Sequence, residues 1–449
     1  MSPVPPNDPQ DLPTGQAPEL TARTERALVR ASAPSTRHAL VEIAARRLPR
    51  REARVPVNLA LVLDRSGSMG GAKFALARRA VEQALAQLHP EDRFALVVYD
   101  DAVDVLAPSS PATPEARRDA LDRLADVHPR GSTDLAGGWL TGAEQVALAL
   151  DARPRDAAAA VSRCLLLTDG LANHGLTDLD ALLGHAAALR ERGVQTSTFG
   201  VGTDFDERLL AGMADAGGGH FYFLAEPRQI PELIESEVGE ALEVVLRHAV
   251  VELRLAPGVT AEPLTRFRSR LVETDHARSV LRVELGDLVS GQQVELVVAL
   301  HFPVGALAHV VELEVGLLGG EGLPCTPAVP LRWTYASDAA NDAQPRDLEV
   351  DRRVARLQAE RARAEALDHN RAGRYGHARQ GLAMMARSIR SVAHHDAAML
   401  SVADELAADI PALAEAPLSP MELKQRFARG YNAAQSRDAS GLARRRPKE

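Results

Sequence analysis

The chain has 449 residues, 45% of them apolar, and a formal net charge of −9 at pH 7. This length leaves room for about three domains of ~150 residues, and the apolar content excludes a chain that is disordered throughout. Charges of both signs are spread along the sequence, which argues against a nucleic-acid-binding protein. No run approaches the ~18–20 apolar residues of a membrane helix, and the two cysteines form no disulfide or zinc pattern. We therefore expect a cytoplasmic protein with no membrane segment.

The first part of the chain is expected to be largely unstructured. It begins with residues rich in Pro, Asp and Gln and has no apolar core of the kind that a signal peptide needs, so residues 1–33 are predicted to be disordered. Within residues 34–54, Val41-Glu42-Ile43 alternates apolar and polar side chains and has no strand partner of its own nearby. We expect it to pair with a β-sandwich later in the chain.

Residues 55–246 alternate apolar runs with amphipathic segments, which predicts a doubly wound α/β domain with a mostly parallel sheet. Thr177 and Thr203 are expected to cap two of its helices. The expected strands are Val57–Leu63, Phe94–Tyr99, Cys164–Thr168, Gln195–Val201 and His220–Leu224. The expected helices are Lys73–Leu88, Pro114–Ala125, Leu135–Leu150, Asp178–Arg190 and Asp206–Ala214.

Beyond this domain the pattern changes twice. Residues 247–336 alternate apolar and charged side chains with a period of two, which predicts a β-sandwich. Residues 347–430 are rich in Ala, Arg, Leu and Glu and are expected to form a helical hairpin or bundle. Residues 431–449 end in a basic stretch and are expected to be a disordered tail.

Three segments that carry hydroxyl and carboxylate side chains are expected at one edge of the predicted sheet. Asp64, Ser66 and Ser68 follow the first buried strand, Thr133 precedes a helix, and Asp169 follows the strand that ends at Thr168. Ligands of doubly wound sheets bind at the carboxyl ends of the strands, where these segments would meet. All of the side-chain donors are oxygens, which suit a hard divalent cation.

This combination of Asp64-x-Ser66-x-Ser68, Thr133 and Asp169 resembles the metal-ion-dependent adhesion site of von Willebrand factor A domains. The resemblance covers roughly residues 55–246 and is of the bacterial type. It implies that Ser66 and Ser68 bind a Mg²⁺ ion directly, although Ca²⁺ and Mn²⁺ also accept oxygen ligands. It also implies that Thr133, Asp64 and Asp169 bind directly or through water, and that an exchange of Thr133 for Asp169 accompanies ligand binding. A partner's Asp or Glu would fill the remaining position.

The sequence favours a binding module over an enzyme. The spacing around Lys73 fails the phosphate-loop pattern, no dinucleotide fingerprint follows the first strand, and Ser66 has no nucleophile elbow. His174 is the one nearby candidate acid or base for hydrolysis at a metal, and a surface loop residue is the simpler interpretation.

Three hypotheses for function remain open. The first is a cytoplasmic adaptor that binds a partner protein through a metal-bridged acidic residue; the resemblance suggests an AAA+ ATPase or a signalling component as partner. The second is a self-assembling scaffold that uses a neighbouring subunit's carboxylate or its own Asp8, Asp11 or Glu19. The third is a metal-assisted hydrolase. The oligomeric state stays undecided.

Overall fold

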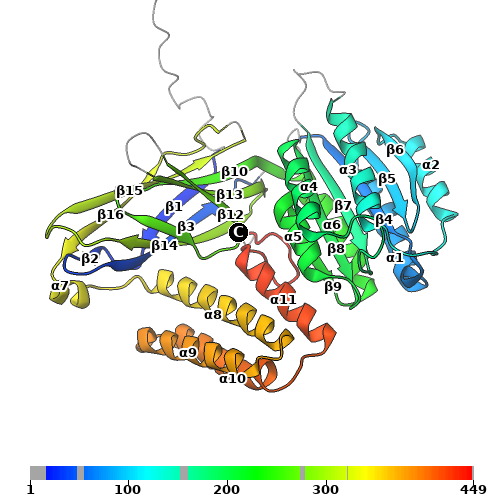
Figure 1. The fold of residues 1–449 in the computed structure, drawn as a ribbon. Helices are drawn as coiled ribbons and strands as arrows, with labels where there is room; N and C mark the ends of the chain where they lie inside the picture. Colours follow the sequence, from blue (N-terminus) through cyan, green and yellow to red (C-terminus); the bar gives the residue numbers. More distant parts are fainter. Residues whose placement is uncertain (1–16, 48–54, 152–159, 274–278, 321, 447–449) are drawn as a thin grey trace, which may run out of the picture.

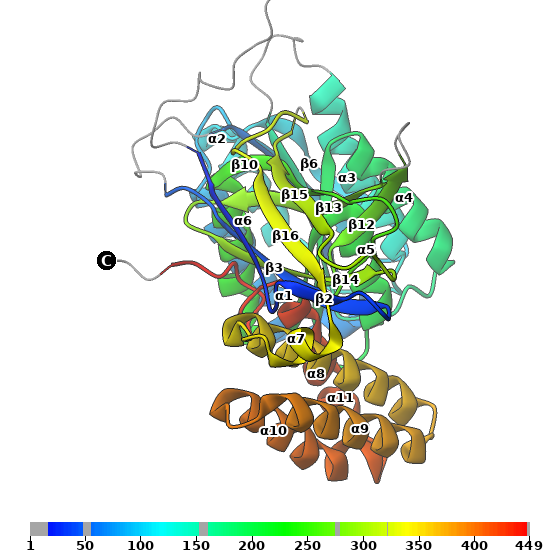
Figure 2. The same cartoon turned by 90° about the vertical axis from the view of Figure 1, so that its left-hand side faces the viewer.

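The structure is a computed structural model that describes residues 17–47, 55–151, 160–273, 279–320 and 322–446. Figure 1 shows an α/β unit beside a pair of facing β-sheets, with a group of C-terminal helices below the paired sheets. Figure 2 shows the same helices stacked beneath the sheets. None of the helices in the described part of the chain is both long and apolar enough to cross a membrane.

The α/β unit has one six-stranded sheet in the order β6-β5-β4-β7-β8-β9, in which only β6 runs antiparallel to its neighbour. Every residue of its central strands is buried, as expected for a sheet covered on both faces. The expected doubly wound, mostly parallel sheet is thus confirmed. The strands are β4 (Val57–Asp64), β5 (Arg93–Tyr99), β6 (Val103–Pro111), β7 (Val161–Thr168), β8 (Val194–Val201) and β9 (Gly218–Leu224).

Helices cover both faces of this sheet. Side chains of α1, α2 and α6 pack on one face, and side chains of α3, α4 and α5 pack on the other. The helices are α1 (Ala72–Ala86), α2 (Pro114–Ala125), α3 (Leu135–Asp151), α4 (Leu179–Glu191), α5 (Glu207–Gly217) and α6 (Ile230–Leu242), with 3₁₀ turns η1 (Gly67–Met69) and η2 (Pro227–Gln229).

Some local expectations for this unit were wrong. The caps of α4 and α5 are Asp178 and Asp206, whose carboxylates accept backbone N–H hydrogen bonds from the first turn, rather than Thr177 and Thr203. A carboxylate is also the better partner for the positive end of a helix. Strand β6 and helix α6 had not been predicted.

The two remaining sheets face one another and enclose a core that includes Trp333, Val283 and Leu296. Their strand orders are β1-β3-β14-β11 and β12-β13-β10-β15-β16-β2. The strands are β1 (Glu19–Thr24), β2 (Leu28–Arg30), β3 (Ser35–Ala44), β10 (Val244–Arg254), β11 (Thr260–Pro263), β12 (Arg268–Glu273), β13 (Ser279–Val289), β14 (Gln293–Phe302), β15 (Val310–Leu318) and β16 (Val329–Ala336).

The N-terminal segment differs from expectation. Residues 1–33 were expected to be disordered, but β1 and β2 lie within them; residues 1–16 lie outside the described residues. β3 pairs with β14 along its length, from Ser35 opposite Phe302 to Ala44 opposite Gln293. The α/β unit is therefore inserted between two strands of the sandwich. β1 and β2 could not be predicted from local composition, because they are stabilised by pairing with β3 and β16, respectively.

The C-terminal region holds more helix than a hairpin. Helices α8, α9 and α10 pack together around an Ala- and Leu-rich core, and α11 packs between them and the α/β unit. α10 had not been predicted, and α11 extends four residues past the expected end of the helical region at residue 430. The helices are α7 (Asp338–Ala343), α8 (Leu348–Arg371), α9 (Tyr375–Ala393), α10 (Ala397–Ala414) and α11 (Pro420–Ala434).

Residues 431–446, which were expected to be disordered, lie against both folded units. Arg437 is held at Glu240 of α6, and the backbone N–H of Gln293 in β14 donates to the carbonyl of Arg444 at 2.8 Å. Arg445 pairs with Glu243 at 2.6 Å. The basic tail is thus bound by acidic residues that lie far away in the sequence, which a local charge pattern does not reveal.

Candidate metal centre

The five predicted site residues come together at the carboxyl edge of the parallel sheet. Strands β4 and β7 are parallel neighbours, with Leu63 opposite Leu167, so Asp64 and Asp169 emerge side by side. Thr133 comes from the loop that leads into α3, and Ser66 and Ser68 come from the turn between β4 and α1. Three loops therefore contribute oxygen-bearing side chains to one place.

Asp64 is fully buried and held from two sides. Its Oδ1 accepts a hydrogen bond from the backbone N–H of Ser66 at 2.7 Å, and its Oδ2 accepts one from the Thr168 hydroxyl at 2.6 Å. Burial raises the pKa of Asp64 to about 6, and the hydrogen bonds from Thr168 and Ser66 oppose that rise. Thr168 is a positioning residue that the sequence pattern did not single out.

Hydroxyls link the first loop to the second carboxylate. The Ser66 and Ser68 hydroxyl oxygens lie 3.1 Å apart, and the Ser68 hydroxyl donates to Asp169 Oδ1 at 2.7 Å. Asp169 is fully buried, Ser66 is nearly so, and Ser68 is exposed at the rim. The site therefore opens to solvent on the side of Ser68.

Thr133 completes the set from the third loop. Its backbone N–H donates to the Asn173 side chain at 3.2 Å, and a Cβ placed on Gly170 would lie 3.3 Å from the Thr133 hydroxyl oxygen. The residue after Asp169 thus lies beside Thr133, where glycine leaves the most space.

An ion cluster around the buried Asp100 fixes this third loop. Asp100, at the end of β5, accepts hydrogen bonds from Arg65 at 3.0 Å and from Arg130 at 2.8 Å. Burial works to raise the pKa of Asp100, but hydrogen bonds from Arg130 and Arg65 keep it below its ordinary value. Gly131 has φ of 68°, and any Cβ there would lie 2.3 Å from the carboxylate of Asp101. Glycine is therefore required at this position.

Lys73 lies in the site although no motif assigned it there. Its ammonium group pairs with Asp169 Oδ2 and also contacts the Ser68 carbonyl oxygen at 3.3 Å. It is the first lysine in a chain whose basic residues are nearly all arginine. That scarcity was the only sequence signal for it.

The residues present fit a divalent cation. Three hydroxyls and two carboxylates gather without sulfur or imidazole, and magnesium takes an all-oxygen shell and usually keeps several waters. In the described ranges no group of three or more His, Cys, Asp or Glu side chains is arranged for a metal. The present set has only two such residues and relies on hydroxyls, so a bound cation would keep much of its charge for another ligand.

Comparison with known proteins identifies the α/β unit. Residues 58–236 match the family model of the von Willebrand factor type A domain, and we conclude that they form such a domain. The chain is 25% identical to the uncharacterized protein YfbK of Escherichia coli over 242 residues, which are 53% of this chain and 40% of that protein. It is 28% identical to inter-alpha-trypsin inhibitor heavy chain H1 of Bos taurus over 217 residues, or 47% of this chain and 23% of that one.

A second bacterial relative matches more of the chain. Uncharacterized protein sll0103 of Synechocystis is 25% identical over 277 residues, 60% of this chain and 63% of that protein. The chain therefore spans less than two thirds of the length of each of these relatives.

Two solved structures share the wider fold. A von Willebrand factor type A protein from Catenulispora acidiphila superposes with a TM-score of 0.64 at 18% identity, covering 84% of this chain and 89% of that one. The ArnB paralog VWA2 from Sulfolobus acidocaldarius superposes with a TM-score of 0.54 at 12% identity, covering 92% of this chain and 99% of that one. The match extends beyond the α/β unit, so the surrounding sheets and helices belong to the shared architecture.

Proposed function

We propose that this protein is a metal-dependent protein-binding module that engages an acidic side chain of a partner. The observation that carries the proposal is the convergence of Ser66, Ser68, Thr133, Asp64 and Asp169 from three loops. These residues would hold a divalent cation, with Mg²⁺ favoured and Ca²⁺ or Mn²⁺ as alternatives. The cation would supply a positive charge and a ligand position for a carboxylate.

The rim of the site suits a protein partner. Ser68, Ser132 and His174 are exposed around it, and Leu171 follows the Asp169-Gly170 turn with 54% of its surface exposed. An exposed leucine next to a charged centre offers apolar contact area beside the electrostatic anchor, as in interfaces with a central hot spot. The kind of partner that we propose is an AAA+ ATPase or a signalling component that presents an Asp or Glu.

The scaffold hypothesis is the second candidate, and one observation bears on it. Glu19, one of the chain's own acidic residues considered for the site, lies in β1, and Arg446 donates to its carboxylate at 2.6 Å. Asp8 and Asp11 lie outside the described residues. The scaffold hypothesis therefore rests on a neighbouring subunit's carboxylate or on Asp8 or Asp11, since Glu19 is already paired.

Catalysis has less support. His174, the candidate acid or base, is exposed on the loop after Asp169, and the neighbouring Asn173 holds the backbone of Thr133. Such contacts organise a binding loop. A hydrolase would need a proton-transfer group held over the metal-bound water.

The test is affinity purification of the full chain with Mg²⁺ and with EDTA, comparing wild type with Asp169→Ala. We expect the same partner to be enriched only for wild type with Mg²⁺. Titration of each purified protein with Mg²⁺ by calorimetry checks the metal separately.

Asp204→Ala is the matched control, because Asp204 is an exposed carboxylate after β8 on the same edge of the sheet but outside the site. It should behave as wild type. Identical partner sets under all conditions would refute the metal bridge, whereas metal-dependent oligomers of the purified chain would favour the scaffold. Ester or phosphoester turnover that is lost in Ser66→Ala would point to a hydrolase.

A further inference from the structure

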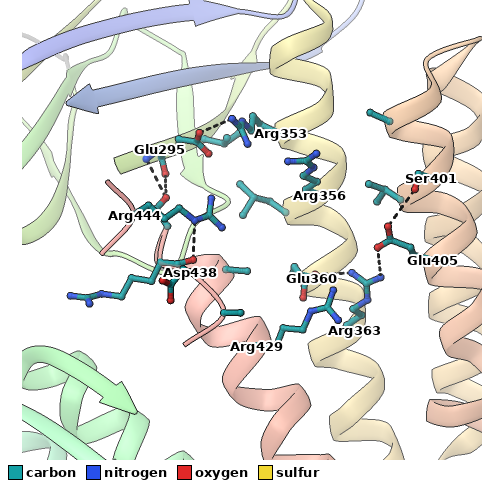
Figure 3. Close-up of a pocket in the computed structure, with 18 residues that line it drawn as sticks. Glu295, Arg353, Arg356, Glu360, Arg363, Ser401, Glu405, Arg429, Asp438 and Arg444 are labelled. Atoms are coloured by element: carbon teal, nitrogen blue, oxygen red, sulfur yellow. Dashed lines mark hydrogen bonds and ion pairs between the residues drawn. The ribbon is translucent and has the colours of Figure 1, made fainter. Parts of the chain in front are cut away.

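A second polar pocket lies away from the candidate metal centre. It has a volume of about 550 Å³ and is enclosed by β14, α8, α10, α11 and the C-terminal segment (Figure 3). None of the five candidate metal-binding residues lines it. It lies at the junction between the sandwich and the C-terminal helices.

The lining is rich in arginine. Six of its eighteen residues are arginines and four are acidic, so the pocket has a net positive lining in a chain whose net charge is −9. Positive charge gathered in a concave site concentrates anions there.

Three of these arginines already have structural partners, which are themselves largely shielded from solvent. These ion pairs involve two of the pocket's acidic residues, and a third, Glu405, lies 3.6 Å from Arg363. The ion pairs are Arg353–Glu295 at 2.8 Å, Arg363–Glu360 at 2.7 Å and Arg437–Glu240 at 3.1 Å.

The other three arginines are available to a ligand. Arg356, Arg429 and Arg444 are exposed and form no ion pair with any residue in the described part of the chain. They come from α8, α11 and the C-terminal segment, as Figure 3 shows. Arg444 uses only its Nε, which donates to the Arg437 carbonyl at 3.0 Å. Guanidinium groups with free donors match phosphate oxygens in a bidentate arrangement.

The pocket also has an apolar wall. Val297, Leu357 and Val402 line it together with three alanines. A volume of this size lies within the ~300–1,000 Å³ range of small-molecule sites. A purely inorganic anion would leave the apolar side unused, whereas a base or another ring could pack on it.

We propose that this pocket binds a phosphorylated organic molecule of nucleotide size, with Arg356, Arg429 and Arg444 holding the phosphate groups. This proposal is independent of the metal centre. Such a ligand would join the sandwich, α8 and the C-terminal segment, so its binding would stabilise their mutual packing.

The experiment titrates the full-length protein with ATP, ADP, pyrophosphate and inorganic phosphate, using calorimetry and thermal unfolding in EDTA. EDTA removes divalent cations and keeps the metal centre out of the measurement. We expect saturable binding of ATP or ADP with a raised melting temperature, and weaker binding of pyrophosphate and phosphate. Arg356→Ala and Arg429→Ala should each weaken nucleotide binding about tenfold or more, because each removes charge-assisted hydrogen bonds.

Arg387→Ala is the matched control. Arg387 is an exposed arginine of α9 that lies outside the pocket. Its loss should change affinity less than twofold, and all three variants should unfold like wild type without ligand. An equal loss of binding in Arg387→Ala, or no saturable binding by any probe, would overturn the proposal. Pyrophosphate that binds as tightly as ATP would overturn the assignment of an organic phosphate.

Discussion

Asp64 of the candidate site is a carboxylate that is buried without exposed surface. Hydrogen bonds from Ser66 and Thr168 compensate in part for its lost hydration. A carboxylate kept in such a place without a full counter-charge is expected where a cation binds. Burial of Asp64 therefore lowers the stability of the metal-free fold, and the same residue belongs to the proposed metal site.

We expect Asp64→Asn to raise the free energy of unfolding of the metal-free protein at pH 7 by up to about 3 kcal/mol. The pKa of Asp64 is raised from 3.8 to about 6 by burial, so the folded state holds this proton more tightly than the unfolded state. Its contribution is favourable below 3.8 and is lost as the pH rises through about 6. Urea unfolding in EDTA at pH 4.0 and 7.0 measures this, and the gain should disappear at the lower pH.

Asp204→Asn, an exposed change on the same sheet edge, should leave the free energy of unfolding unchanged at both pH values. A variant Asp64→Asn that is less stable than wild type at pH 7 would show that its hydrogen bonds outweigh its buried charge.

Lys73 is the second residue whose role is testable. Its ammonium group pairs with Asp169, so a divalent cation at the site would share the Asp169 carboxylate with the positive charge of Lys73. Because like charges repel, Lys73→Met should tighten Mg²⁺ binding by about fivefold, equivalent to ~1 kcal/mol for a partly exposed charge. Calorimetric titration measures the change.

Arg79→Met provides the control, since Arg79 is an exposed cation further along the same helix, α1. It should leave the affinity as in wild type. Weaker Mg²⁺ binding in Lys73→Met would mean that Lys73 orients Asp169 rather than competing for it.

At the scale of elements, the C-terminal segment is bound to the type A domain through α6. Arg437 is half-buried and pairs with the buried Glu240, with its Nη1 3.1 Å from Glu240 Oε2 and 2.7 Å from the Gly441 carbonyl oxygen. The backbone N–H of Ala443 donates to the same Glu240 at 2.9 Å. The end of the chain thus behaves as part of the fold.

Arg437→Ala should lower the free energy of unfolding by about 3–5 kcal/mol, because it leaves Glu240 buried without its counter-charge. Arg445→Ala, which removes an exposed pair with Glu243, should cost less than about 1 kcal/mol. Chemical denaturation of both variants beside wild type measures the difference. Equal losses would mean that the segment contributes through its backbone rather than through Arg437.

At the scale of the whole molecule, the type A domain, the sandwich and the C-terminal helices are closely joined. The type A domain lies in the chain between β3 and β10 of the sandwich, and α11 packs against it through Tyr431, whose hydroxyl donates to Asp215 at 2.8 Å. Lys424 of α11 also donates to the Phe205 carbonyl and Glu207, both at 2.6 Å. Separate unfolding of one part would break contacts of the others.

We therefore expect one calorimetric unfolding transition for the full chain, shifted as a whole to higher temperature by Mg²⁺. The ratio of calorimetric to van't Hoff enthalpy should lie near one, which is the test of two-state behaviour. Two transitions, of which Mg²⁺ moves only one, would show that the type A domain unfolds independently.

The sequence predicted most of the type A domain because its signals are local. Buried strands appear in the sequence as apolar runs, and amphipathic helices appear as periodic patterns. A doubly wound sheet brings its strand ends and loops to one edge, and these carry Asp64, Ser66, Ser68, Thr133 and Asp169. β6, with only one buried residue, carried too weak a pattern to be found.

The sequence by itself determined the alternation of strands and helices and the oxygen-bearing residues at the sheet edge. The tertiary structure alone decided that Lys73 pairs with Asp169, that Arg437 pairs with the buried Glu240, and that β1 and β2 complete the sandwich. It also decided which arginines are left without partners at the junction. The physical reason is that periodicity reports only which face of an element is buried, whereas charge pairing depends on residues that folding brings together from distant parts of the chain.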